Sequence, residues 1–253
     1  MDTYLTKINN RLRKLFYLVK AFLAFFNFAK WGVIIETYKQ TSFNAPFSIS
    51  YSQGGEDLAI LSLMKESKGF YIDVGAHHPN RFSVTRRLYD RGWQGINIDA
   101  NSEVSEIFKK FRPRDTFLAT AIGTKEKYTF FEFLEPALST TNTQWKDKFI
   151  NEGNGIKREI NVIGMKLSQV FELVPDGTSI DLLSIDIEGS DFDALISASF
   201  ETLEPNKFPK FILVETPIPV RFAKKMDCIK YLENFGYELY CVLPMSSILK
   251  YSL

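Results

Sequence analysis

Short apolar runs and amphipathic stretches alternate along the chain from about residue 50 onward. Runs rich in β-branched and aromatic residues predict strands at residues 70–74, 96–100, 116–122, 128–133, 161–165, 180–187, 211–215 and 237–243. Apolar positions at helical spacing predict helices at residues 51–65, 83–91, 102–110, 166–173, 191–199 and 226–235. This alternation predicts an α/β fold, with a mainly parallel central sheet and helices on both faces.

The rest of the chain is organised around residues 70–100, which have the pattern strand, glycine turn, helix, strand. This is a βαβ unit, in which ligands lie beyond the carboxyl ends of the strands. Asp73 and Asp99 are both at such ends. A carboxylate like Asp99 can accept both hydrogen bonds of a ribose diol. The alternative interpretation is an ordinary α/β core with acidic residues at the strand ends by chance.

The phosphate-binding loop of a dinucleotide fold is missing from this unit. That loop needs three glycines in the pattern G-x-G-x-x-G, and only Gly75 stands between the strand and the helix. His77 and Pro79 follow where a pyrophosphate would approach the backbone. The site therefore suits a ribose-bearing cofactor without a diphosphate, such as S-adenosylmethionine. A nicotinamide-dependent oxidoreductase is disfavoured for the same reason.

Residues 1–40 differ in character from residues 41–253, which we expect to form the main domain. The first 30 residues carry six basic side chains against Asp2 alone, a net of +5, and since the chain totals +1, about −4 remains for the rest. Basic residues ahead of aromatic ones predict a helix on an anionic membrane surface, or one that covers the core or a subunit interface. Charges at Lys20 and Lys30 disfavour a membrane span.

Composition adds two expectations. A formal charge of +1 gives no overall field that would attract nucleic acid, so we expect no nucleic-acid partner. Cys228 and Cys241 are the two cysteines, and both stand among apolar residues. Free buried thiols are typical of a reducing compartment, so we expect a cytoplasmic protein with possible membrane association through residues 1–40.

Several motifs occur in an order that resembles the FkbM family of S-adenosylmethionine-dependent methyltransferases. They are Ser52-Gln53-x-Gly55-Glu56-Asp57, Tyr71-Ile72-Asp73-Val74-Gly75-Ala76-His77-x-Pro79, Ser83-Val84-Thr85, Gly92-Trp93-x-Gly95-Ile96-Asn97-Ile98, Arg112-Pro113-Arg114-Asp115, Leu138-Ser139-Thr140 and Leu183-Ser184-Ile185-Asp186-Ile187-Glu188-Gly189. The resemblance covers roughly residues 50–189. One departure is Asp99-Ala100, where the family often has a glutamate followed by proline.

The resemblance implies a Rossmann-like class I methyltransferase fold and S-adenosylmethionine as cofactor. With the strand-end pattern, it leads us to expect one set of cofactor-binding residues: Gln53, Asp57, Asp73, Gly75, Ala76, Asp99, Ala100, Asn101, Ala121 and Asp186. The activity implied is O-methylation, with a hydroxyl of a sugar, nucleotide sugar or glycan as acceptor, as in polysaccharide biosynthesis. The alternative is a non-catalytic binding or scaffold protein on a methyltransferase fold.

Five residues are candidates for the acceptor step. His77 and His78 are the only histidines and follow the first strand, so either is a candidate base for the hydroxyl proton. Asp186, Glu188 and Glu215 end the neighbouring strands and are suited to hold a hydroxyl, offset the sulfonium or bind a divalent ion. The spacing of these acids alone does not decide for a metal. The polar stretch 137–155 predicts a loop or lid over the site.

Overall fold

The fold is a computed structural model that describes residues 34–35, 49–64, 66–216 and 220–252. The basic and aromatic segment predicted at residues 1–40 lies outside this part, except for its residues 34–35. Within the described part, no helix has both the length and the apolar character needed to cross a membrane.

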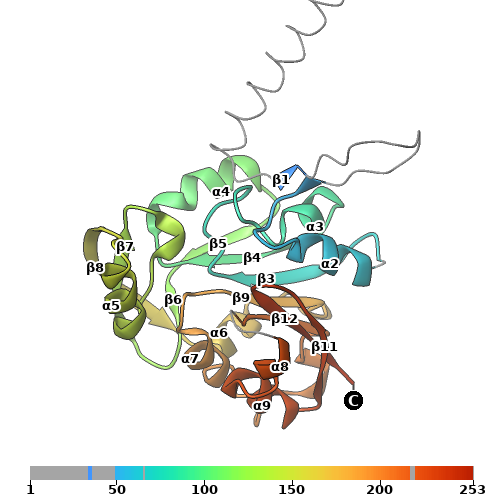
Figure 1. The fold of residues 1–253 in the computed structure, drawn as a ribbon. Helices are drawn as coiled ribbons and strands as arrows, with labels where there is room; N and C mark the ends of the chain where they lie inside the picture. The colour runs from blue at the N-terminus through green and yellow to red at the C-terminus, as the bar shows by residue number, and fades with distance from the viewer. Residues whose placement is uncertain (1–33, 36–48, 65, 217–219, 253) are drawn as a thin grey trace, which may run out of the picture.

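A seven-stranded sheet forms the centre of the molecule (Figure 1). From one edge to the other, its strands are β11 (Tyr237–Val242), β12 (Ser246–Tyr251), β10 (Phe211–Glu215), β9 (Leu182–Ile185), β3 (Phe70–Val74), β4 (Gln94–Asp99) and β5 (Thr116–Ala119). The pairs from β10 to β5 are parallel, and β12 runs antiparallel to both its neighbours. The predicted mainly parallel central sheet of an α/β fold is confirmed.

Helices cover both faces of this sheet. Side chains of β3 alternate between the two faces of the sheet. Phe70, Ile72 and Val74 belong to one apolar cluster, and Tyr71 belongs to the other. The first cluster takes in α6 (Leu167–Glu172), α7 (Asp191–Ile196) and α9 (Asp227–Glu233). The second packs α2 (Glu56–Leu63) and α3 (Arg86–Asp90) against the opposite face. The α4 helix (Ser105–Phe111) packs beside β5.

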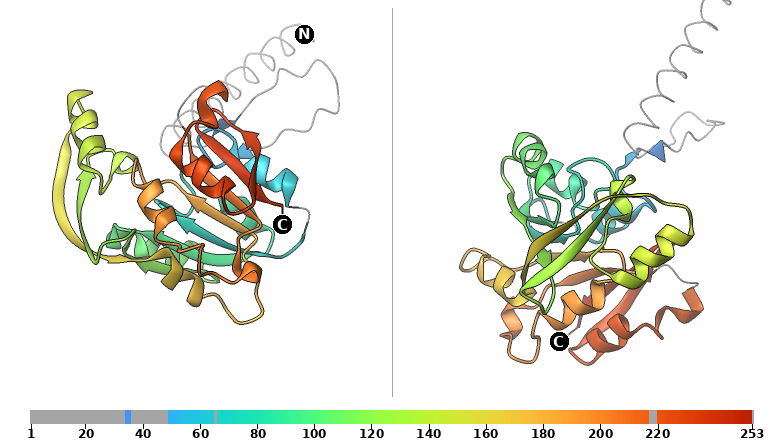
Figure 2. Two further views of the ribbon diagram at one scale, coloured as in Figure 1. Left: turned by 90° about the horizontal axis from the view of Figure 1, so that it is seen from below. Right: turned by 90° about the vertical axis from the view of Figure 1, so that its left-hand side faces the viewer.

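A smaller lobe projects from the carboxyl side of the central sheet. It is a three-stranded sheet in the order β6 (Ala121–Ile122), β8 (Ile156–Met165) and β7 (Lys127–Phe133), with helix α5 (Thr143–Asn151) beside it. Figure 2 shows the two long strands of this lobe curving away from the central sheet. Phe131, Phe133 and Phe149 give the lobe an apolar cluster of its own.

Three details correct the sequence predictions. Residues 137–155 are not one loop, because Asn142 caps a helix by accepting hydrogen bonds from the N–H groups of Gln144 and Trp145, and α5 follows. The β8 strand begins at Ile156 rather than at residue 161, since its polar first half pairs with β7. The chain also ends in β12, a strand that the sequence analysis did not predict.

Two residues before the main domain take part in the described structure. The β1 strand (Ile34–Ile35) pairs antiparallel with β2 (Ile49–Ser50). This short pairing crosses the expected domain boundary at residues 40 and 41.

Candidate functional site

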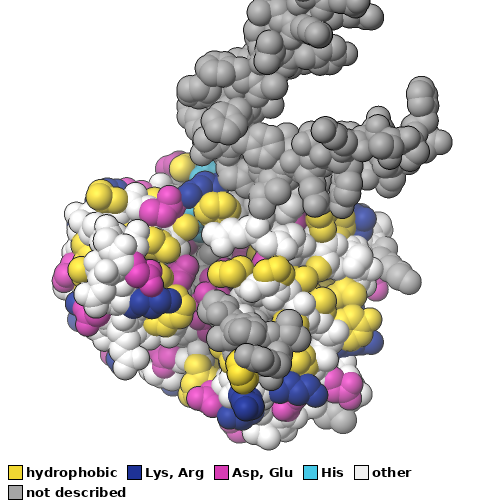
Figure 3. Space-filling model, in the orientation of Figure 1, with side chains coloured by type: hydrophobic (Ala, Val, Ile, Leu, Met, Phe, Trp, Pro, Cys, Tyr) yellow, Lys and Arg dark blue, Asp and Glu magenta, His cyan; other side chains and the backbone are white. Residues whose placement is uncertain are grey.

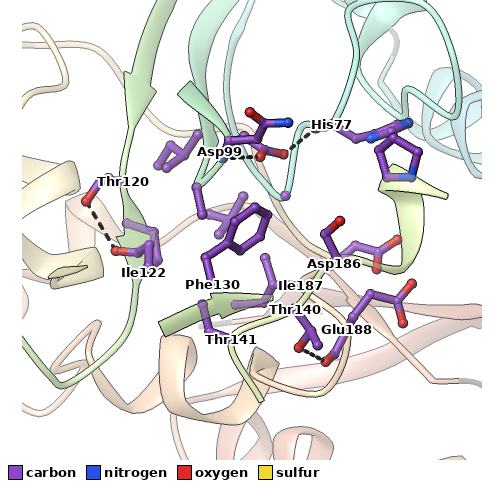
Figure 4. Close-up of a pocket in the computed structure, with 18 of the residues that line it drawn as sticks. His77, Asp99, Thr120, Ile122, Phe130, Thr140, Thr141, Asp186, Ile187 and Glu188 are labelled. Carbon is purple, nitrogen blue, oxygen red and sulfur yellow. Dashed lines mark hydrogen bonds between the residues drawn. The ribbon is translucent and has the colours of Figure 1, made fainter. Parts of the chain in front are cut away.

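The candidate site lies at the carboxyl ends of the central strands, where β3, β4 and β9 stand side by side. A first pocket of about 670 Å³, open solvent included, lies there between these strand ends and the lobe. Figure 4 shows residues from both parts of the chain around it, with Asp99 and His77 on one side and Asp186 and Glu188 on another.

Gly75 makes the close approach at the end of β3 possible. Its φ of +84° is in the left-handed region, and an added Cβ would lie 1.8 Å from the carbonyl oxygen of Asp186. The β3 and β9 strand ends therefore approach each other more closely than any side chain at this position would allow. This steric requirement explains why the motif has a glycine at position 75.

Asp99 ends β4 and faces the first pocket, as the sequence analysis expected. Its Oδ2 accepts a hydrogen bond from the N–H of His77 at 2.8 Å, and its Oδ1 accepts one from the N–H of Asn101 at 2.8 Å. Burial raises the pKa of Asp99 to about 6. Each carboxylate oxygen keeps a second lone pair, so the group is fixed in place and still able to accept from a diol.

An apolar surface lies across the pocket from the acids. Ile98, Ile122 and Phe130 line it, together with the backbone around Ala100 and Ala121. Asn101 lines the same pocket, so three further residues expected for cofactor binding are brought together here. An apolar slot beside a fixed carboxylate fits a nucleoside, whose base is flat and whose ribose carries two hydroxyls.

Three other residues expected to bind cofactor line neither pocket described here. Asp57 is buried and accepts hydrogen bonds from the hydroxyls of Ser50 and Ser52, so it holds the turn before α2. Asp73 accepts a hydrogen bond from the Thr85 hydroxyl at 2.6 Å, on the α3 side of the sheet. Ala76 is buried and its N–H donates to the carbonyl of Ile98. These positions indicate supporting roles behind the site.

A second pocket of about 520 Å³, open solvent included, adjoins the first. The two pockets share five lining residues: Gly75, His77, Ala137, Asp186 and Glu188. The rest of the second pocket's lining combines polar residues, Ser52, Gln53, Glu56 and Ser246, with apolar ones, Phe82, Val84 and Met245. Gln53 therefore lies in this second pocket, together with Glu56 of the same sequence motif.

The geometry of the two histidines argues against a histidine base. The His77 Nε2 atom lies 3.1 Å from Nη1 of Arg81, which can only donate, so the lone pair of that nitrogen is occupied. Burial and the Arg81 charge lower the pKa of His77 to about 4. His78 lines neither pocket, and its Nδ1 accepts from the N–H groups of Asn80 and Arg81. Both rings serve the turn between β3 and α3.

Arg112 holds the turn between β3 and α3 through hydrogen bonds, a role that the sequence analysis did not predict. Its side chain is fully buried, and its Nε and Nη2 donate to the carbonyl of Pro79 at 3.1 and 2.7 Å. It also donates to the hydroxyls of Ser83 and Thr85 and lies 3.7 Å from Asp115. The one feature of the sequence that could have indicated this role is that Arg112 begins one of the family motifs.

Asp186, Glu188 and Glu215 meet where the two pockets join. Oxygen atoms of all three lie within 4.8 Å of one another. In Figure 4 the carboxylates of Asp186 and Glu188 point to the same side of the pocket. Withdrawal from bulk water, with repulsion from Glu56 and Asp73, raises the pKa of Asp186 to about 6. Withdrawal from bulk water, with repulsion from Asp186 and Asp191, raises the pKa of Glu188 to about 8 and that of Glu215 to about 10.

The lobe fastens the loop that carries Glu188. The Thr140 hydroxyl donates to the carbonyl of Glu188 at 2.8 Å, and the Asn142 amide donates to the carbonyl of Gly189 at 2.7 Å. The Trp145 ring lies against Gly189, where an added Cβ would be 2.0 Å from it. Glu188 itself has a φ of +50°, a strained conformation for a non-glycine residue that these contacts hold in place.

Residues 73–239 match the family description "Methyltransferase FkbM domain". The match covers about two thirds of the chain and includes both pockets' strand ends. The protein belongs to the FkbM methyltransferase family. The resemblance seen in the sequence is thus confirmed, and the match extends beyond residue 189 through β10 to residue 239.

Two solved structures are similar to this FkbM methyltransferase. One is a TehB-like SAM-dependent methyltransferase from Corynebacterium glutamicum, at 11% identity and TM-score 0.39, covering 79% of this chain and 88% of that one. The other is a precorrin-6y C5,15-methyltransferase from Geobacter metallireducens, at 15% identity and TM-score 0.42, covering 78% and 87%. No protein with a curated function matches the chain significantly.

S-adenosylmethionine is the cofactor of this family, and the first pocket fits it. The carboxylate of Asp99 faces the pocket where a ribose diol can be held, and the apolar surface at Ile98 and Phe130 suits the base. Acidic side chains at Asp186 and Glu188 suit the positive sulfonium. No cluster of phosphate-binding glycines is needed, in agreement with the lone Gly75.

Proposed function

We propose that this methyltransferase methylates a hydroxyl oxygen, and that the acceptor is a sugar, a nucleotide sugar or a glycan. The observation that carries the proposal is the position of Asp186 and Glu188, which line both pockets at once. An acceptor in the second pocket would present its reacting atom at these carboxylates, and the first pocket would present the methyl group to the same place.

The lining of the second pocket supports a polyhydroxylated acceptor. The exposed Gln53 amide offers a donor and an acceptor, and Glu56 keeps Oε1 beside the Oε2 atom that accepts from the N–H of Gly54. Phe82 adds an aromatic surface, against which the C–H face of a sugar ring can pack. On the face shown in Figure 3, acidic and basic side chains are interspersed, without the single basic field on which nucleic-acid binding depends.

Bound S-adenosylmethionine supplies a methyl carbon that exchanges its bond to sulfur for a bond to the acceptor oxygen, leaving a neutral thioether. The hydroxyl must lose its proton near the transition state, and a carboxylate within hydrogen-bond reach can accept it. A pKa of about 6 makes Asp186 a stronger base than an ordinary aspartate while it stays largely ionised at neutral pH. The remaining chemistry is orientation of the two reactants.

The proposal is tested by incubating the full chain with labelled S-adenosylmethionine and a panel of nucleotide sugars and glycans, with mass detection of one methyl gain. The matched amino sugars in the same panel distinguish oxygen from nitrogen acceptors. Asp186→Asn should abolish most of the gain, whereas Glu159→Gln, an exposed site on β8, should not. Tight cofactor binding with no methyl gain for any acceptor would favour the binding or scaffold alternative.

The proposed location of this activity is the cytoplasm. Cys228 and Cys241 are free thiols in the structure, in keeping with a reducing compartment.

A further inference from the structure

The carboxylates at the junction of the pockets come from two neighbouring strands. Asp186 and Glu188 follow β9, and Glu215 is the last residue of β10. Their oxygen atoms lie within 4.8 Å of one another. Carboxylates this close repel each other unless protons or a cation offset their charge.

A fourth acid near the cluster, Asp191, has one carboxylate oxygen without a partner. Asp191 is only 8% exposed, and its Oδ1 is buried without a hydrogen bond, although backbone N–H groups of residues 187–191 stabilise the group. It interacts electrostatically with Asp186, Glu188 and Glu215. Glu215 is only 9% exposed, and none of the hydrogen bonds or ion pairs among the described residues involves its carboxylate. A buried carboxylate oxygen without a hydrogen bond, beside an acid that no described basic side chain pairs with, points to a positively charged ligand.

Two buried acids elsewhere in the protein are paired with basic side chains. Glu132 is held by Lys157 and Arg158, and Asp115 lies by Arg112. In the described part of the chain no lysine or arginine forms an ion pair with the cluster. The Lys148 ammonium, whose charge acts on Glu188 and Glu215, lies over the Trp145 ring at 4.0 Å.

We propose that Asp186, Glu188 and Glu215 bind a hard divalent cation, Mg²⁺ or Mn²⁺. Oxygen-only ligand sets are those that such cations prefer. Together with Asp191 the site carries four formal negative charges, and a divalent cation with the sulfonium offsets three of them. The cation is placed to hold the acceptor hydroxyl and lower its pKa. That role rests on the proposed function, whereas the binding site does not.

The distances suit such a cation. Ligand oxygens on opposite sides of one Mg²⁺ lie about 4.0–4.2 Å apart, and those around Ca²⁺ about 4.6–5.2 Å. The cluster, at no more than 4.8 Å, needs at most a small inward movement of flexible glutamate side chains to enclose a cation. Three protein ligands leave coordination positions for water and for an acceptor oxygen.

Binding is measured on the full chain after EDTA treatment, with neither cofactor nor acceptor present. Titration calorimetry with Mn²⁺ should show one site per chain, and added Mn²⁺ should raise the melting temperature. Tb³⁺ bound at the same carboxylates should luminesce on tryptophan excitation, because the Trp145 ring lies against Gly189, next to Glu188. Mn²⁺ should displace Tb³⁺, and Trp145→Phe should remove most of the luminescence but keep the Mn²⁺ site.

Glu215→Gln and Glu188→Gln should each weaken Mn²⁺ binding at least about tenfold, since each removes a charged ligand and preserves its shape. In EDTA both variants should melt at or above the wild-type temperature, because a neutral amide avoids the cost of a buried carboxyl group that must either repel its neighbours or stay protonated. A variant that merely folds poorly would bind Mn²⁺ more weakly and also melt at a lower temperature. Weaker binding with an unchanged or higher melting temperature therefore indicates the loss of a ligand. Glu159→Gln, an exposed acid on β8, is the matched control and should leave both quantities unchanged.

Two results would overturn the cation site. One is no Mn²⁺ binding to the EDTA-treated wild type at millimolar concentration, and the other is equal binding to both glutamine variants. The methyl-transfer assay is run separately in EDTA and in Mn²⁺. Cation binding with no methyl gain would contradict the proposed function alone, and methyl gain undiminished by EDTA would contradict the cation's role.

Discussion

Asp99 is the residue whose role in cofactor binding has the clearest geometric basis. Two backbone N–H groups fix its carboxylate at the end of β4. A hydrogen bond to a charged group contributes about 1.5–3 kcal/mol, so Asp99→Ala should weaken S-adenosylmethionine binding roughly 10- to 100-fold. Calorimetry measures this. An unchanged dissociation constant would remove Asp99 from the site, and Asn101→Ala, on the same pocket wall, is a useful comparison.

The same carboxylate should make cofactor affinity depend on pH. The pKa of Asp99 is about 6, so below pH 6 the group is mostly protonated and loses acceptor capacity. Affinity should therefore fall as pH decreases from 7.5 to 5, by up to about tenfold per pH unit below the pKa. S-adenosylhomocysteine, with its neutral sulfur, is the better probe because the other acids affect it less. Asp99→Asn should flatten the profile; an equally steep profile would assign the titration elsewhere.

His77 illustrates what a sequence motif leaves undetermined. Its position after β3 suggested a base for the acceptor, but the ring nitrogen that would take the proton faces Arg81. We expect His77→Ala to keep kcat within about tenfold of wild type, whereas loss of a general base costs about 10²–10⁴-fold. Steady-state kinetics with saturating cofactor would decide. A loss of the larger size, with cofactor affinity unchanged, would restore the histidine to the acceptor step.

Asp73 shows why some site residues could not be predicted individually. A strand end can be found from the apolar run before it, but the face on which its last polar side chain lies depends on the strand's register. Asp73 alternates with Ile72 and Val74 and so points toward α3, where Thr85 donates to it. Asp99 and Asp186 lie at ends that open onto the pockets, and Glu215 meets Asp186 without lining either pocket. The sequence therefore predicted correctly which edge of the sheet carries the polar residues, but only in part which of these side chains point into the pockets.

At the scale of elements, the strands most readily predicted were those buried on both faces. The β3, β9 and β10 strands are continuous apolar runs, because helices cover both sides of them. The β8 strand begins with charged residues that pair across to β7, as Arg158 does with Glu132, so its first half lacked an apolar signal. The β12 strand has only Ile248 and Leu249 in sequence as a core signal. These two segments form strands because they pair with neighbouring strands, and the local sequence pattern does not indicate that pairing.

The α5 helix is where the lobe meets the acidic loop, and Asn142 connects the two. Its side chain caps α5 and also donates to the carbonyl of Gly189. Asn142→Ala should lower the free energy of unfolding by about 0.5–2 kcal/mol through loss of the cap. Loss of the second contact should also loosen Glu188, weakening Mn²⁺ binding. Urea unfolding and Mn²⁺ titration measure the two effects.

Asn151→Ala at the other end of α5 serves as the control for this substitution, because Asn151 is exposed. If Asn142→Ala lowers stability without changing Mn²⁺ affinity, the lobe does not position the acidic loop.

At the scale of the whole molecule, the central sheet brings together residues far apart in sequence. Gly75, Asp99, Asp186 and Glu215 are separated by up to 140 residues, yet parallel strands place their ends at one edge. The buried Arg112 network holds the β3–α3 turn from the other side. A site of this kind depends on topology rather than on any local segment. The family motifs predicted it because they mark successive strand ends.

The relation of residues 1–40 to the main domain is open to a direct test. The pairing of Ile34–Ile35 with Ile49–Ser50 spans two residues on each strand, whereas Ser50 is also held by Asp57 of α2. Removing β1 therefore removes only this short pairing, and the hydrogen bond between Ser50 and Asp57 remains. A chain beginning at Ser42 should fold, bind S-adenosylmethionine with wild-type affinity and melt within a few degrees of the full chain.

The shortened chain should also bind anionic vesicles more weakly, because it lacks the net +5 of the first 30 residues. Vesicle sedimentation at low and high salt measures this, with neutral vesicles as the control, since electrostatic attraction to the surface is screened by salt. An insoluble shortened chain would show instead that residues 1–41 cover part of the core. Equal vesicle binding by both chains would assign membrane contact to another surface, or to none.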